Sequence, residues 1–242
     1  MKTTKAIGGW KKILAVGCSH GIYAVAAVLR FRDAFKPDKV VHLGDAVDMT
    51  ALRSGAHGSN DEAAPILPDV DGGIKFLYQL RPNVFLNGNH EDRIFRDLHS
   101  SNAIRSYAAQ QICNALHDTF KDIRCETVLP YDGIEQGITI GGFRYMHGVF
   151  YNENHCRDHA EAFGNVVFAH AHRAGVATGR RSDKPKGYCV GTLTRRASMD
   201  YAKARRATLG WSQAFVWGYY RDDQSQLWLH ENNNPGEWLL PM

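Results

Sequence analysis

The sequence predicts an α/β protein that forms one domain over residues 1–242. Residues 12–43 contain an apolar strand, an amphipathic helix and a second apolar strand, the pattern of a right-handed βαβ unit. Further short apolar strands follow, each ending in a polar turn, and the chain beyond Gly175 is mostly β in character. A chain of this length buries a sizeable core, and no repeat or linker divides it.

Composition favours a globular protein without a membrane-spanning segment or a disulfide framework. The net charge is +4 and hydrophobic residues make up 44% of the chain, which is ordinary for a soluble protein. Because no apolar run reaches the length of a membrane span, we expect no membrane partner. The five cysteines are scattered without a CxxC pair, which argues against a disulfide framework and favours a cytoplasmic compartment. The sequence indicates no obligate protein partner.

The first predicted strands and helix follow from the spacing of apolar residues and from the glycine and proline residues that end them. Residues 12–16 form a short apolar strand, and residues 21–35 have the apolar spacing of a helix that ends before Pro37. Residues 40–43 form the next strand, which Gly44 stops. We expect this strand to lie parallel to the first one.

A polar segment, residues 49–71, then interrupts the pattern. It contains Gly, Ser, Asn and acidic residues, so we interpret it as a surface insertion that could overhang the site. A helix over 73–80, a strand over 84–86 and helices over 91–99 and 103–120 are predicted next.

From Glu126 the chain turns to β, with strands at ITI, FRYMHG and VVFAHAH. A short helix over 156–163 separates the last two strands. His155, Cys156 and His159 fall at its start, and we interpret them as a solvated helix face rather than a zinc site. The remaining segments, YCVGTLT, SQAFVWGYY and QLWLHE, are strand-like, with RDDQS as a hairpin loop.

Side chains with metal-ligand chemistry follow five of the predicted strands. Imidazole, carboxylate and amide oxygen bind divalent first-row metals, and there are too many groups here for one tetrahedral ion but enough for two ions that share a carboxylate. Each motif alone is a weak signal, whereas their joint occurrence at strand ends is a strong one. The residues are Cys18, His20, Asp45, Asp48, Asn89, His90, His147, His170 and His172.

The motifs CSH, GDAVD, GNHED, MHG and AHAH resemble, in this order, those of the calcineurin-like metallophosphoesterase superfamily. The usual forms in that superfamily are D-x-H, G-D-x-x-D, G-N-H-[DE], H and G-H-x-H. The resemblance covers about residues 13–172. It implies two mixed β-sheets packed as a sandwich and flanked by helices, with the motifs on loops at one sheet edge. It also implies a hydrolase acting on phosphate mono- or diesters.

The resemblance further implies two divalent transition-metal ions (zinc, manganese or iron) that share Asp45 and a water or hydroxide. The ligands of the first ion would be Cys18, His20, Asp45 and His172. The ligands of the second would be Asp45, Asn89, His147 and His170. His90 would stabilise charge at phosphorus or protonate the leaving oxygen, and Asp48 would orient His90.

Two positions depart from the superfamily pattern: Cys18 replaces an aspartate and Ala169 a glycine. A thiolate binds zinc well, so we expect zinc or iron in the first position and exclusion of magnesium. Alternatively, Cys18 is a small buried residue that fills space, and the first ion is weakly held or absent.

Basic residues cluster after His172, interleaved with Tyr188, Tyr201 and Trp211. Cations attract a phosphate backbone and aromatic rings stack on bases, which favours a nucleotide or nucleic-acid substrate over a phosphoprotein. A solvated charged face is the alternative. We take Arg173 and Arg195 as candidate substrate-binding residues.

Two other functions stay open beside the phosphoesterase. One is a catalytically impaired, metal-stabilised nucleic-acid-binding protein, with Cys18 as the mark of lost catalysis. The other is a protein phosphatase. Because His90 and Asp48 bind no metal in the implied arrangement, their presence favours an enzyme.

Overall fold

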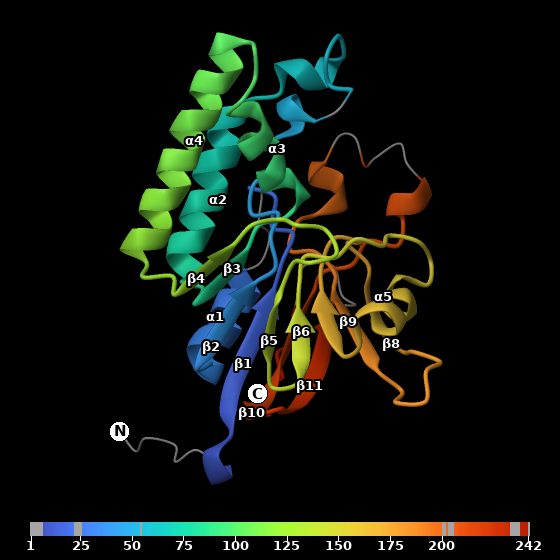
Figure 1. Cartoon of the computed structure of the whole chain (residues 1–242). Helices are drawn as coiled ribbons and strands as arrows, with labels where there is room; N and C mark the ends of the chain where they lie inside the picture. Colours follow the sequence, from blue (N-terminus) through green and yellow to red (C-terminus); the bar gives the residue numbers. More distant parts are fainter. Residues whose placement is uncertain are drawn as a thin grey trace.

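The structure is a computed structural model of the chain, and it describes residues 7–21, 26–53, 55–199, 202, 206–232 and 238–241. Two mixed β-sheets pack face to face, and helices cover their outer faces (Figure 1). This arrangement confirms the predicted fold class.

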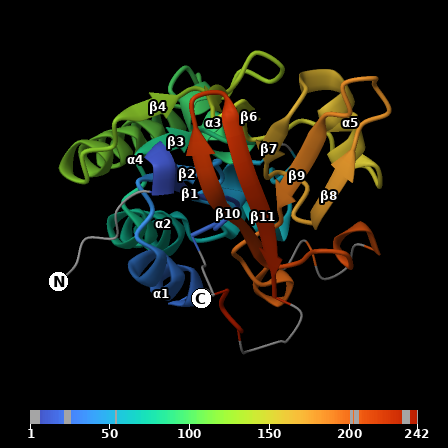
Figure 2. The same cartoon turned by 90° about the horizontal axis from the view of Figure 1, so that it is seen from below.

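The first sheet contains six strands in the order β11-β10-β1-β2-β3-β4. Strands β1 to β4 run parallel, while β10 pairs antiparallel with β1 and with β11. The β10–β11 hairpin lies beside β8 and β9 of the second sheet (Figure 2). The strands are β1 (Lys11–Val16), β2 (Lys39–His42), β3 (Val84–Leu86), β4 (Thr127–Leu129), β10 (Ala214–Arg221) and β11 (Gln224–Glu231).

The second sheet contains five strands in the order β5-β6-β7-β9-β8. Its central strands β6, β7 and β9 are parallel, and the two edge strands are antiparallel to their neighbours. The strands are β5 (Ile138–Ile140), β6 (Phe143–Tyr145), β7 (Val166–Phe168), β8 (Ala174–Thr178) and β9 (Lys186–Val190).

Five α-helices surround the sheets in the described part of the chain. Helices α1 and α2 cover the outer face of the first sheet, α3 and α4 pack beside them, and α5 covers the second sheet (Figure 1). They are α1 (Ala26–Phe35), α2 (Ile66–Leu80), α3 (Asn89–Asp97), α4 (Ala103–Asp122) and α5 (His155–Phe163). Short 3-10 turns are η1 (Ile7–Gly9), η2 (Thr50–Leu52), η3 (Asn60–Ala63), η4 (Arg196–Ser198) and η5 (Arg206–Thr208).

Among the described helices, none combines the length and the apolarity that a membrane crossing requires.

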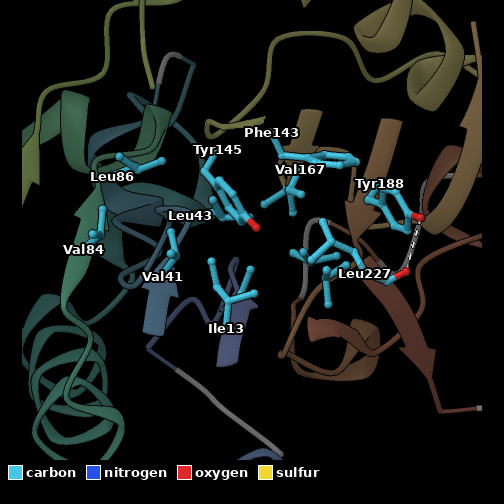
Figure 3. Packing of buried hydrophobic residues seen from close by; sticks show 14 of the residues in the cluster. Ile13, Val41, Leu43, Val84, Leu86, Phe143, Tyr145, Val167, Tyr188 and Leu227 are labelled. Carbon is cyan, nitrogen blue, oxygen red and sulfur yellow. Dashed lines mark hydrogen bonds between the residues drawn. The ribbon is translucent and has the colours of Figure 1, made fainter. Parts of the chain in front are cut away.

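The main core lies between the two sheets (Figure 3). Because side chains alternate along a strand, Ile13 of β1 faces the second sheet whereas Leu14 faces the helices. Tyr188 also belongs to this core, and its hydroxyl donates a hydrogen bond to the carbonyl of Leu227 at 3.3 Å. Tyr188 is therefore a packing residue, and the expectation that it stacks on bases was wrong.

Helix α2 begins at Ile66, seven residues before its predicted start at Gly73. The start was predicted too late because two prolines were taken to exclude a helix. Pro65 is the N-cap and Pro68 lies in the first turn, where backbone N–H groups have no partner within the helix, so proline is tolerated there. The predicted insertion 49–71 thus contains η2, η3 and the first six residues of α2. Residues 22–25 of the predicted first helix, and Tyr201, fall outside the described residues.

Helix α5 presents its histidines to the interior, which corrects the expectation of a solvated face. His155, Cys156 and His159 are all buried against the second sheet. The ring of His159 stacks on Phe168 of β7, with centroids 3.6 Å apart. The helix is therefore anchored by these side chains.

Candidate metal centre

The predicted site residues come together at one edge of the sandwich. They lie on the loops that follow β1 and β2 and at the start of α3, shortly after β3, in the first sheet, and on the loops that follow β6 and β7 of the second (Figure 1). In each sheet these strands are parallel to one another, so their carboxyl ends meet at a common edge. The packing of the two sheets then brings the two sets of loops together.

Three groups of side chains are close enough to hold an ion, with the ligand atoms in each group within 4.8 Å of one another. Asp45 belongs to two of the groups. The amide oxygen of Asn89 also lies 2.9 Å from His170 Nδ1 and 3.0 Å from His147 Nε2. The groups are Cys18 with His20, Asp45 and His172; Asp45 with His147 and His170; and His20 with Asp48 and His90.

Five of these residues have a left-handed backbone conformation. Their φ angles lie between 51° and 57°, a region that costs a residue with a Cβ atom roughly 1–2 kcal/mol. Such conformations persist where the surrounding structure enforces them, and they concentrate at functional sites. The residues are Cys18, His20, Asp45, His170 and His172.

Glu91 holds the loop after β2 against the start of α3, a role that the sequence prediction missed. Its buried carboxylate accepts backbone N–H bonds from Asp45 at 2.8 Å, Ala46 at 2.7 Å and Gly88 at 2.7 Å. The fourth residue of the GNHE motif was the signal available for this contact, because a glutamate at the third helical position can cap its own helix.

The close approach of these loops requires glycine at position 88. A Cβ atom there would lie 2.1 Å from Asp45 Oδ1 and 2.7 Å from His147 Cε1. Neither neighbour can move without displacing the site. Gly88 therefore sets the spacing between the loop that carries Asp45 and the loop that carries Asn89.

The two aspartates of the site are ionised. Burial opposes this, but the neighbouring His147 and His90 outweigh it and hold the pKa of Asp45 well below its usual value. Hydrogen bonds from His20 and His90 likewise overcome burial and lower the pKa of Asp48. The centre thus contains two carboxylates in their charged form.

The imidazoles of the HxH motif are neutral. Burial and the neighbouring His147 lower the pKa of His170 to about 3, and burial with His20 lowers that of His172 well below its usual value. Burial, reinforced by Asp45, raises the pKa of the Cys18 thiol. A neutral imidazole offers a lone pair to a metal ion, whereas the thiol must lose its proton on binding one.

The donor set fits divalent ions. His172 Nδ1 is buried and has no hydrogen-bond partner in the described part of the chain. The Nε2 atoms of His20 and His172 are 2.9 Å apart, as two lone pairs directed at a common point would be. Nitrogen, oxygen and one sulfur atom are the ligands that zinc and iron accept in proteins.

Asp48 and His90 lie in the same cluster. Asp48 Oδ1 is 3.3 Å from His90 Nδ1, and it also accepts a hydrogen bond of 3.0 Å from His20 Nδ1, a contact that the sequence did not indicate. Arg93, which was also missed, reaches both ring nitrogens of His90 at 3.2 and 3.3 Å. Its position one helical turn after His90 was the available signal.

The predicted basic substrate residues differ in their surroundings. Arg173 donates hydrogen bonds to the backbone carbonyls of Tyr151 and Asn152, so its guanidinium braces that loop. Arg195 is exposed directly before η4.

Further along the basic run, two arginines form ion pairs, which supports a solvated charged face for that part. Arg180 pairs with Glu161 at 3.0 Å and Arg181 pairs with Asp183 at 2.9 Å.

Three aromatic rings border the cluster. Trp211 lies edge-on to His172 with centroids 4.2 Å apart, Tyr131 is 5.7 Å from His147, and Tyr151 is 6.1 Å from His170. Tyr151 is 74% exposed, so its ring is open to a ligand. Of these three, the sequence indicated only Trp211, because the other two lie on loops without a recognisable motif.

Comparison with known proteins gives relatives of low sequence identity. Gene 54 protein of Mycobacterium phage D29 is 28% identical over 172 residues, which span 62% of this chain and 63% of that protein. An archaeal phosphodiesterase structure is 14% identical with a TM-score of 0.46, covering 91% of this chain and 99% of that one. A protein serine/threonine phosphatase from Saccharomyces cerevisiae is 15% identical with a TM-score of 0.40, covering 94% and 82% of the respective chains.

A family comparison covers nearly the whole chain. The family described as calcineurin-like phosphoesterase matches residues 11–242, which include both sheets and every strand end described above. The chain therefore belongs to the calcineurin-like phosphoesterase family.

Proposed function

We propose that the chain hydrolyses phosphate mono- or diesters with two divalent metal ions. The observation that carries this proposal is the convergence of nitrogen, oxygen and sulfur donors from both sheets on the carboxylate of Asp45. One ion would be held by Cys18, His20, Asp45 and His172. The other would be held by Asp45, Asn89, His147 and His170.

The ions, when bound, supply a water of lowered pKa and positive charge beside the phosphate. The protein orients the imidazole ligands through their other ring nitrogens. His147 Nδ1 donates to the carbonyl of Leu43 at 2.6 Å, and His20 Nδ1 donates to Asp48 at 3.0 Å. In each ring Nε2 is thereby left with its lone pair for a metal ion.

His90 is our candidate for charge stabilisation or proton transfer at the leaving oxygen. Its backbone N–H donates to Asp45 Oδ1 at 3.0 Å, and its Nε2 lies 3.7 Å from Asp45 Oδ2. Asp48 contacts Nδ1 of the same ring, and Arg93 contacts both ring nitrogens. Their contacts hold the imidazole beside the proposed reaction centre without using it as a metal ligand.

We propose zinc or iron for the position beside Cys18. The Sγ atom is 4.0 Å from Asp45 Oδ2, and both are buried, so an ion placed between them would have a sulfur and an oxygen ligand. Thiolate favours these metals over magnesium.

For the substrate we propose a nucleotide or nucleic acid. The exposed ring of Tyr151 beside His170 offers a stacking surface. Exposed Arg195 offers a positive charge shortly after Leu193, whose backbone N–H donates to the carbonyl of Cys18 at 3.1 Å. Bases stack on such rings without regard to sequence.

The test of the activity is hydrolysis of bis(p-nitrophenyl) phosphate by protein loaded with Zn²⁺, Mn²⁺ or Fe²⁺. We expect turnover with at least one metal, and its loss in His90→Ala protein of unchanged metal content. Fully loaded wild-type protein without activity would instead support the nucleic-acid-binding alternative.

The test of the substrate class is salt dependence. Cleavage of a single-stranded oligonucleotide should fall steeply between 50 and 200 mM salt because bound phosphates displace counterions, whereas bis(p-nitrophenyl) phosphate should respond little. Equal salt dependence for both would contradict a nucleic-acid substrate.

A further inference from the structure

A cavity of about 530 Å³ opens beside the metal centre. It is lined by residues 48–51, by residues between 60 and 69 and by Met199. These residues belong to η2, η3, the start of α2 and the turn after η4, or lie next to them. Segments far apart in the chain therefore enclose it. Its size falls within the range of small-molecule sites, roughly 300–1,000 Å³. We refer to it as the Asp48 cavity.

The lining of the Asp48 cavity suits an uncharged ligand. Most of its described residues are alanine, proline, isoleucine or methionine, and none is lysine or arginine. It includes three carboxylates, each of which already accepts hydrogen bonds. Asp61 pairs with Arg53, and Asp69 accepts the backbone N–H groups of Asp48 and Met49 at 2.8 and 2.6 Å. A phosphate would meet only negative charge here.

The Asp48 cavity is connected to the proposed reaction centre through a shared residue. Asp48 lines the cavity, and its side chain contacts His20 and His90. Met49, the next residue, is buried and lines the cavity as well. A substrate whose phosphate lies at the metal centre can therefore extend its organic group past Asp48 into the cavity.

We propose that the Asp48 cavity binds the uncharged organic group of the phosphate ester, an aromatic ring system of nucleobase size. This inference rests on the proposed function. Methionines from two segments, Met49 and Met199, line the cavity, and thioether sulfur makes favourable contacts with aromatic rings. The phosphate stays at the metal centre, outside the carboxylate-lined space.

Direct binding tests the Asp48 cavity without relying on catalysis. Adenosine, which carries no phosphate, is titrated into EDTA-treated protein and followed by ligand-observed NMR, with ribose as the sugar-only probe and benzyl alcohol as the arene-only probe. We expect saturable binding of adenosine and benzyl alcohol and none of ribose. Ribose binding as strong as adenosine binding would overturn the aromatic assignment.

A cavity-filling variant locates the binding. Ala64 lines the Asp48 cavity and has an ordinary extended backbone, so Ala64→Leu introduces bulk without backbone strain. We expect adenosine affinity to fall about tenfold in this variant. Ala51→Leu, on a second wall, gives the same test if the first variant folds poorly. Ala103→Leu, at the exposed start of α4, is the matched control and should bind normally.

Kinetics then separate the two proposals. In Ala64→Leu, the KM for bis(p-nitrophenyl) phosphate should rise about tenfold, while competitive inhibition by inorganic phosphate stays unchanged. Unaltered adenosine binding and KM in both filled variants would overturn the cavity assignment and leave the phosphoesterase standing. Absence of hydrolysis in loaded wild-type protein, together with saturable adenosine binding, would overturn the phosphoesterase instead.

Discussion

The Cys18 thiol is fully buried at the base of the centre, where the usual residue of the family pattern described above is an aspartate. Burial and the nearby carboxylate of Asp45 raise the pKa of this thiol, so without an ion it keeps its proton. A bound metal would remove that proton, and metal affinity at this position should therefore increase with pH.

Replacement of this sulfur should reveal whether it is a ligand. We expect Cys18→Ser to lower bound metal by about one equivalent and activity by roughly 10- to 100-fold, because a hydroxyl is a poor substitute for a thiolate ligand. Metal analysis of the purified protein and the phosphodiester assay measure both effects. Cys113→Ser, on the half-buried side of α4, is the control. Unchanged metal stoichiometry in Cys18→Ser would show that the cysteine only fills space.

At the scale of single residues, the sequence predicted what lies at strand ends and missed what those residues contact. Asp45 and His172 follow strands of different sheets, and it was the resemblance of their motifs to the calcineurin-like superfamily that grouped them. The second partner of Asp48, His20, depends on side-chain rotamers that no motif specifies. Tyr188 looked accessible beside basic residues, but strand alternation and the packing of the second sheet bury it.

At the scale of elements, the loops after β2 and β3 are fitted to each other through Gly88. We expect Gly88→Ala to lower metal content and activity strongly, because the added methyl group overlaps Asp45 Oδ1 and its neighbour His147. Gly175→Ala in β8 is the matched control, since its Cβ would meet only the Cys156 sulfur at 3.2 Å. Metal analysis and circular dichroism of both variants measure the effect. Wild-type metal content in Gly88→Ala would mean that the loops tolerate wider spacing.

Helix α5 should make the fold sensitive to acid through His159. Its Nδ1 donates to the carbonyl of His155 at 2.7 Å, and its Nε2 accepts the N–H of Val149 at 3.0 Å, so the ring is held neutral. Burial lowers its pKa from 6.5 to about 4. The unfolded chain thus takes up this proton first, and stability is lost as the pH falls from 6.5 towards 4.

We expect His159 to account for about 3 kcal/mol of that loss, from the size of the pKa shift. Urea unfolding of EDTA-treated protein at pH 7 and pH 4 measures it. The difference between the two pH values should be smaller in His159→Gln by this amount, and unchanged in His117→Gln, whose side chain is exposed on α4. An identical acid dependence in wild type and His159→Gln would refute the assignment.

The boundaries of the elements show why the sequence pattern predicted the strands more accurately than the insertion at residues 49–71. Strand β1 was predicted to within one residue because its apolar run, residues 13–16, lies between Lys12 and Gly17. Helix α2 was predicted late because its first turn contains proline. Segment 49–65 carries little periodicity, and its course is determined by contacts such as the ion pair between Arg53 and Asp61.

At the scale of the whole molecule, the proposed ligands come from both sheets. Cys18, His20 and Asp45 follow strands of the first sheet, and His147 and His172 follow strands of the second. Ions bound between them would add to the hydrophobic interface that joins the two sheets. Such binding stabilises the folded state because the unfolded chain has no comparable site.

Removal of metal should therefore lower the melting temperature. At free metal 100-fold above the dissociation constant, each ion contributes about 3 kcal/mol, which corresponds to a shift of roughly 5–10 °C in a protein of this size. Differential scanning calorimetry with and without EDTA measures it, and the shift should reappear when zinc or iron is returned. In Asp45→Asn protein EDTA should have little effect. A melting temperature insensitive to chelation in the wild type would contradict ion binding between the sheets.

The long sequence separation between the ligands has a consequence for biosynthesis. His20 and His172, whose ring nitrogens meet at 2.9 Å, are 152 positions apart. A nascent chain thus lacks a ligand of the proposed first ion until His172 has been translated, long after His20. Metal acquisition at that position is then a late event in maturation, and truncated translation products would carry no complete centre.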